Sequence, residues 1–304
     1  MPTSPSRRDA LKFGVAAAAT IAAGSTSLLA QPADAPKRRP IKKAVMWGMI
    51  KAGKTVREKF QVLKEAGFDG VEMDSPGGPP NDEIVKAAHD TGILIEGVVD
   101  SVHWNQTLSH GNPAVRAAGL KALETALRDC KAQGGTSVLL VPGVVNAQVS
   151  YDECYERSQI EIRKAIPLAE ELGVKIAIED VWNDFLLSPM EAARYVDEFK
   201  SAAVAWHMDL GNVAAYGYPE QWVKILNKRI VKLHVKEFSR KKMNAEGKGK
   251  GFSVKLGEGD INWKAVMHAL DDVGYNTWMC AEVSGGGLEE LKDVAARMDR
   301  ILSL

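Results

Sequence analysis

The feature that most constrains the fold is a regular alternation, beyond residue 40, of short apolar runs with longer helical segments. The apolar runs span five or six residues each and several are rich in Val or Ile, as is typical of strands buried on both faces. They cover residues 44–49, 69–73, 94–98, 137–141, 174–179, 204–209, 230–235 and 277–282. Strict strand–helix alternation predicts a parallel sheet with crossover helices, and eight units within residues 41–304 favour a closed (β/α)₈ TIM barrel of the α/β class.

The segments between the apolar runs carry apolar residues at helical spacing. Several end in a glycine just before the next strand, as at Gly67 and Gly173, which suits the left-handed position after a helix. Helices are expected over residues 56–66, 84–91, 115–133, 155–172, 190–199 and 265–273. Residues 239–260 are instead basic and rich in glycine, and we expect a long loop there, after the seventh strand. Because no glycine-rich phosphate loop follows a strand, a nucleotide-binding fold is not indicated.

The first 35 residues read as an export signal. Arg7 and Arg8 precede Leu11 and Lys12, an Ala-rich apolar stretch follows over residues 13–30, and small residues at 33–35 suit cleavage. The paired arginines resemble a twin-arginine signal, which predicts a periplasmic or otherwise exported protein that leaves the membrane once the signal is cut. The alternative is a basic tail before an ordinary secretory signal or a retained anchor. The rest of the chain, residues 41–304, is then a single barrel domain.

The composition narrows the range of partners. Lys plus Arg and Asp plus Glu are both 39, so the formal net charge is zero and nothing favours nucleic acid or an anionic membrane as a partner. The three cysteines form no CxxC pair, so neither a thiolate zinc site nor a disulfide framework is indicated. The sequence leaves the oligomeric state open, a homo-oligomer included.

Metal-capable side chains lie at the ends of four consecutive late strands. Three of these strands are expected to end in Glu179, Asp209 and Glu282, and the strand between the last two carries His234. Each residue taken alone could be a solvated loop residue or a helix cap. Together, at the end of a barrel where active sites form, three carboxylates and one imidazole predict a site for one divalent cation, Mn²⁺, Mg²⁺, Co²⁺ or Zn²⁺.

At these residues the chain resembles the sugar-phosphate isomerase/epimerase family of xylose-isomerase-like barrels, which includes enzymes of the D-tagatose 3-epimerase and L-ribulose-5-phosphate 3-epimerase type. The resemblance covers about residues 41–302. The matching segments are Ile-Ala-Ile-Glu at 176–179, Met-Asp-Leu-Gly-Asn at 208–212, Leu-His-Val-Lys at 233–236, Leu-Gly-Glu-Gly-Asp-Ile-Asn at 256–262 and Ala-Glu at 281–282.

The resemblance implies roles for individual residues. Glu179, Asp209, His234 and Glu282 would bind the metal, and Glu179 and Glu282 would also transfer protons. Arg240, six residues after the histidine, and Asn183 match sugar contacts. The chain departs from many members in having Asn212 where they have His, and Glu237 where Asp usually follows Lys236. Independently of the resemblance, His103, Glu72 and Trp47 are expected to contact the sugar because they lie at or just after strand ends, with packing as the alternative for Trp47. The full set of expected substrate-binding residues is Arg240, Asn183, His103, Asn212, Lys236, Glu72 and Trp47.

The expected activity is metal-dependent isomerisation or epimerisation of a small-molecule sugar, with proton transfer through an enediolate. The residues do not choose between epimerisation and aldose–ketose isomerisation. For the basic residues in 239–260, binding of a substrate phosphate and simple solvation both stay open. The alternative functions are a metal-dependent hydrolase like the apurinic endonucleases and an exported sugar-binding barrel without turnover.

Overall fold

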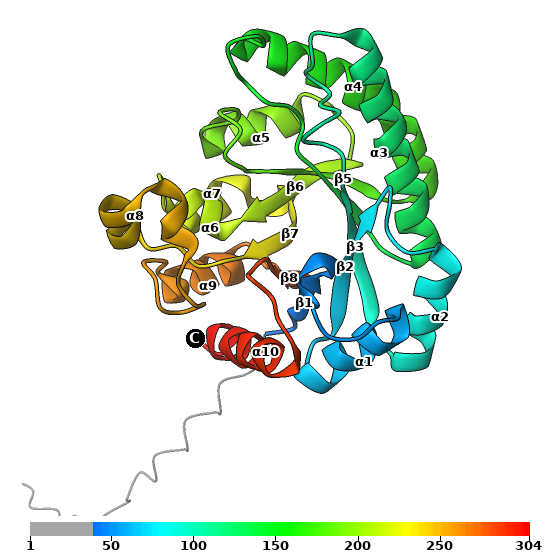
Figure 1. The fold of residues 1–304 in the computed structure, drawn as a ribbon. Helices are drawn as coiled ribbons and strands as arrows, with labels where there is room; N and C mark the ends of the chain where they lie inside the picture. Colours follow the sequence, from blue (N-terminus) through cyan, green and yellow to red (C-terminus); the bar gives the residue numbers. More distant parts are fainter. Residues whose placement is uncertain (1–38) are drawn as a thin grey trace, which may run out of the picture. The chain divides into compact units, whose positions relative to one another are not determined.

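The computed structural model describes residues 39–304, so the predicted signal peptide lies outside the described residues. Eight parallel strands close into a barrel in chain order, and the first strand pairs with the last, with Ala44 opposite Cys280. Figure 1 shows the strands at the centre with the helices around them. The prediction of a (β/α)₈ barrel is confirmed.

The strands lie close to their predicted positions. They are β1 Lys42–Met46, β2 Gly70–Ser75, β3 Leu94–Asp100, β4 Ser137–Leu140, β5 Lys175–Glu179, β6 Val204–Asp209, β7 Ile230–Val235 and β8 Trp278–Ala281. Two of the differences lie at the carboxyl ends of strands. Residues Trp47–Met49 form a 3₁₀ turn, η1, instead of continuing β1, and Glu282 follows β8 instead of ending it.

One long helix follows each strand, and several begin earlier than their apolar pattern suggested. The long helices are α1 Val56–Ala66, α2 Asn81–Thr91, α3 Pro113–Gln133, α4 Tyr151–Leu172, α5 Pro189–Asp197, α7 Pro219–Leu226, α9 Trp263–Asp272 and α10 Leu288–Leu302. Short elements are α6 Leu210–Ala214 and η2 Asn227–Arg229. Gly67 and Gly173 end α1 and α4 at φ values of +89° and +67°, as expected. Within residues 39–304, no helix has the length and apolar content of a membrane span.

Residues 239–260 are more ordered than the long loop that the sequence predicted. They form α8 Arg240–Glu246 and η3 Lys248–Phe252. The Ser239 hydroxyl caps α8 by accepting from the Lys242 amide at 3.3 Å. Glu237 fixes the far end, because its carboxylate accepts from the Gly257 amide at 2.8 Å and from Trp263 Nε1 at 2.7 Å. Hydrogen bonds between residues this far apart in the sequence cannot be predicted from a local pattern of Lys and Gly.

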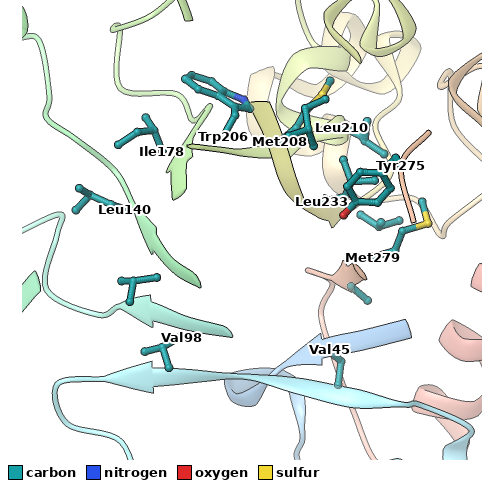
Figure 2. Packing of buried hydrophobic residues seen from close by; sticks show 14 of the residues in the cluster. Val45, Val98, Leu140, Ile178, Trp206, Met208, Leu210, Leu233, Tyr275 and Met279 are labelled. Carbon is teal, nitrogen blue, oxygen red and sulfur yellow. The ribbon is translucent and has the colours of Figure 1, made fainter. Parts of the chain in front are cut away.

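The strands separate an apolar layer from a polar one. Val45, Val98, Leu140 and Ile178 are buried and lie on β1, β3, β4 and β5 of the barrel wall (Figure 2). Strand alternation places their sequence neighbours on the opposite face, inside the barrel. That interior holds small residues and an unusual number of buried polar groups: Glu72, Glu96, His207, Lys232, His234 and Cys280. Burial of so many ionisable groups requires that they pair with one another.

The deepest of these pairs joins two strands across the barrel. Lys232 Nζ lies 2.6 Å from Glu96 Oε2, and the two side chains are 3% and 0% exposed. Lys232 also donates to the Glu96 carbonyl. Because desolvation offsets much of the attraction, the pair itself adds little net stability, but removal of one partner leaves the other charged and buried.

We therefore expect Lys232→Met to lower the free energy of unfolding by about 3–5 kcal/mol. Urea unfolding followed by far-UV circular dichroism measures the change. The matched control is the double variant Lys232→Met/Glu96→Met, which removes both charges and should recover most of the loss. A single variant as stable as the parent would contradict this account of the pair.

Candidate functional site

Four side chains meet at the carboxyl end of the barrel. Glu179 and Asp209 are the last residues of β5 and β6, His234 lies near the end of β7, and Glu282 follows β8. Each offers one ligand atom, and these atoms all lie within 4.8 Å of one another. We call this set the four-residue cluster. The structure thus brings together all four residues that the sequence predicted as metal ligands.

His234 lies at the centre of the cluster. Its Nδ1 is 2.9 Å from Glu179 Oε1, 3.0 Å from Glu282 Oε2 and 4.0 Å from Asp209 Oδ2. Its other ring nitrogen, Nε2, lies 2.8 Å from Glu72 Oε2 on the inner side. A carboxylate on one nitrogen fixes the ring and leaves the other directed at the cluster, as in many metal-binding histidines.

Burial and mutual repulsion make the carboxylates of the cluster differ in their protonation. Burial raises the pKa of Asp209 to about 7 and also raises that of Glu179. For Glu282, burial acts in the same direction, but the positive charges of His234 and Lys236 outweigh it and lower the pKa. For His234, burial is outweighed by Glu72 and Glu179, so its pKa is raised well above the usual value.

Lys236 adds a positive charge at the edge of the cluster. Its Nζ lies 2.8 Å from both Asp209 Oδ2 and Glu282 Oε2. The side chain reaches this position across Gly211, where an added Cβ would come 2.2 Å from Lys236 Cγ and 2.8 Å from the Lys236 carbonyl oxygen. Only glycine leaves room for this close approach. The ammonium group of Lys236, a residue that the sequence predicted to contact substrate, therefore lies beside two carboxylates of the cluster.

The backbone around Asp209 is held by two neighbours. Asp180 Oδ1 accepts from the Asp209 amide at 3.0 Å and from Trp206 Nε1 at 3.0 Å. Asn212 donates its amide to Asp209 Oδ1 at 2.7 Å and its side-chain Nδ2 to the Asp180 carbonyl at 2.9 Å. These bonds hold Asn212, predicted as a sugar contact, against Asp209 and Asp180. Sequence reasoning missed Asp180, although it directly follows Glu179.

The structure places Glu72 inside the barrel, against His234. It was predicted to contact a sugar hydroxyl, but it is 1% exposed and its contact is with His234 Nε2. Next to it, His207 is 0% exposed and its ring centroid lies 4.2 Å from that of His234. Burial lowers the pKa of His207 well below its usual value, so this ring is neutral at pH 7. Both residues contact His234 from the interior of the barrel.

The other predicted sugar contacts are held by residues outside the cluster, although His103 lies near enough to Glu282 for the charge of that carboxylate to act on it. Asn183 Nδ2 donates to the Gly143 carbonyl at 2.7 Å, and His103 Nδ1 accepts from the Val141 amide at 3.3 Å. Burial lowers the pKa of His103 to about 4. Trp47 packs edge-on against Phe60.

Arg240 is turned toward the segment after β6. Its guanidinium donates to the carbonyls of Ala214, at 2.8 Å, and of Gly217, and it lies over the Tyr218 ring. These two bonds use Nε and Nη2 and hold the guanidinium against the segment after β6. These contacts tie the side chain to the residues between β6 and α7, and the expected contact of Arg240 with substrate stays a prediction.

Known proteins share this arrangement of elements. The chain is 24% identical over 238 residues to L-ribulose-5-phosphate 3-epimerase UlaE of Escherichia coli O1:K1, an alignment that covers 74% of this chain and 81% of that protein. A crystal structure of a D-tagatose 3-epimerase-like protein superimposes with a TM-score of 0.73 at 17% identity, over 86% of this chain and 98% of that one. The IOLI protein with a bound zinc atom gives a TM-score of 0.70 at 17% identity, over the same shares.

Structural likeness at such identities concerns the fold alone. The membership of the chain is shown by a family model, described as the xylose isomerase-like TIM barrel, which matches residues 60–303. This range spans the barrel from α1 to α10 and includes all four residues of the cluster. The resemblance found in the sequence is thereby confirmed: the chain belongs to the xylose isomerase-like TIM barrel family.

Proposed function

We propose that this chain is a divalent-metal-dependent isomerase or epimerase of a small-molecule sugar, acting by proton transfer through an enediolate. The observation that carries the proposal is the pair Glu179 and Glu282, which approach the same nitrogen of His234 from β5 and from the end of β8. The names of the relatives, which are sugar epimerases, support the same class of reaction.

The donor atoms fit a divalent cation. Ligands at about 2.0–2.6 Å from one ion lie within roughly 5 Å of one another, and the four donor atoms here lie within 4.8 Å. Three carboxylates and one imidazole suit Mn²⁺, Mg²⁺, Co²⁺ or Zn²⁺. Glu179, Asp209, His234 and Glu282 would hold the cation, which when bound would stabilise the negative charge that develops on the sugar oxygens.

The chemistry left to the chain is proton transfer. A C–H bond beside a carbonyl is a weak acid, so a base must be held against it in a fixed geometry. Glu179 and Glu282 can divide the work, one removing the proton and the other returning one to the opposite face, which inverts the carbon. A single glutamate that serves two adjacent carbons would instead interconvert aldose and ketose. Lys236 and His234 hold Glu282 ionised and in place.

We further propose that the protein works outside the cytoplasm on an unphosphorylated sugar. The paired arginines of the leader support the first part. The second part follows from the first, because phosphorylated sugars are mainly cytoplasmic, and part of the Arg240 guanidinium is bound to main-chain carbonyls.

The metal proposal predicts that His234→Ala loses the bound cation, because His234 is the central ligand and the only imidazole among the four. Metal analysis of the purified variant by mass spectrometry measures the content per chain. His268→Ala, which alters an exposed histidine on α9, is the matched control and should keep the parent's content. Full metal content in His234→Ala would disprove the site as described.

The proton-transfer proposal predicts that Glu179→Gln and Glu282→Gln each lower turnover by about 10²–10⁴-fold, because an amide cannot accept the proton. Incorporation of solvent deuterium into a panel of keto-sugars measures the rate, with metal content measured beside it. Glu156→Gln, an exposed position on α4, is the control. Near-parent exchange in one variant would make that glutamate a ligand only, and sugar binding by the parent without exchange would favour a binding protein.

The export proposal predicts that replacement of Arg7 and Arg8 by Lys retains the protein in the cytoplasm with its leader uncut, because a twin-arginine signal requires both arginines. Fractionation of expressing cells, followed by immunoblotting, compares this variant with the parent. A parent protein found uncut in the cytoplasm would remove the basis for an extracytoplasmic substrate.

A further inference from the structure

A cavity of about 690 Å³ opens beside the four-residue cluster. At its inner end it is lined by Glu282 and Lys236, so it is continuous with the candidate active site. From there it runs between the segment that follows η3 and the first turns of α10. Its volume lies within the range of about 300–1,000 Å³ that is usual for small-molecule sites. A cavity of this kind, next to reactive groups, can hold the part of a substrate that does not react.

The cavity has an apolar part as well as a charged one. The apolar lining residues are Met49, Phe252, Val254, Leu256, Val283 and Val294. Phe252 links the cavity to the cluster, because its ring lies 5.2 Å from Lys236 Nζ and 4.9 Å from the ring of Trp182. These residues come from η1, from η3 and the connection that follows it, from the segment after β8 and from α10, so separate elements present apolar surface to one space.

The charges around the cavity do not suit an anion. Five carboxylates and three cations line it, and each cation is paired. Lys236 lies between Asp209 and Glu282, and Lys255 Nζ is 3.0 Å from Asp293 Oδ2. Arg297 lies 2.7 Å from Glu258 and 3.0 Å from Asp293. A phosphate would therefore meet an excess of negative charge, and each cation already lies beside a carboxylate.

We propose that this cavity binds an uncharged, largely apolar substituent of the sugar substrate, so that the substrate is a keto-sugar carrying an alkyl or aryl group and not a phosphate ester. The inference rests on the proposed function, because it assumes that the sugar ring is held at the cluster. Where the substituent occupies the anomeric carbon, the carbonyl must lie on another ring carbon, next to the C–H bond that Glu179 or Glu282 would address.

The test compares the methyl and phenyl glycosides of one ring-keto sugar with its phosphate ester, by isothermal titration calorimetry on the metal-loaded protein. We expect the phenyl compound to bind at least tenfold more tightly than the methyl compound, a difference of about 1.4 kcal/mol. The phosphate ester should bind more weakly than either. Equal affinity for the two glycosides, or tightest binding of the phosphate ester, would overturn the proposal.

Two variants locate the preference in the cavity. Val294→Trp fills it from α10 and Val254→Asp adds a charge from the opposite wall, so each should reduce the phenyl-to-methyl ratio to below threefold. Two different walls are altered so that a folding defect in one variant leaves the other to decide. Val85→Trp, at a 44% exposed position on α2, is the matched control and should keep the full ratio. A ratio that neither cavity variant changes would overturn the proposal.

Deuterium exchange on the same compounds separates this inference from the proposed function. Exchange into both glycosides without any phenyl preference would leave the epimerase or isomerase assignment intact and overturn the cavity assignment. A phenyl preference that depends on Val294 and Val254, without exchange into any sugar, would overturn the assignment of turnover and retain the cavity as the binding site of the substituent.

Discussion

The ring of His234 connects two layers of buried charge, and the geometry of the site depends on it. Nε2 lies 2.8 Å from Glu72, deep in the barrel, and Nδ1 lies 2.9 Å from Glu179 and 3.0 Å from Glu282 at the mouth. A buried imidazole with a carboxylate on each side has little freedom to rotate. The direction of Nδ1 is therefore fixed by Glu72, which lies in the barrel interior and not at the mouth where a ligand would bind.

This arrangement has a cost in stability, which the rest of the fold offsets. Desolvation of charged groups inside the barrel opposes folding, and their mutual pairing recovers only part of the loss. The apolar layer between strands and helices, which includes Val45, Val98 and Ile178, provides the compensating burial. The outer face of each strand thus contributes most of the apolar burial that stabilises the fold, and the inner face carries the ionisable groups of the site.

The sequence predicted the parts of the molecule that depend on local pattern. Strand periodicity and βα order gave the barrel, and the position of Glu179, Asp209 and His234 at strand ends predicted their convergence. The contact of Glu72 with His234 joins residues 162 positions apart, and no local pattern encodes it. Likewise, Arg240 has the spacing of a substrate contact, but its side-chain direction follows from carbonyls on α6 and beyond, which only the folded chain brings near.

Gly211 has no functional group, yet the position of the Lys236 side chain depends on its missing Cβ. The smallest possible enlargement there, by one methyl group, would move an ammonium group away from two carboxylates without altering any residue of the cluster. In a mutational survey, substitution of Gly211 would therefore lower activity as substitution of a reactive residue does. Sensitivity to substitution alone would wrongly identify Gly211 as a residue that takes part in the reaction. Among divergent homologues, the size of this one residue would report whether the lysine keeps its place beside the carboxylates.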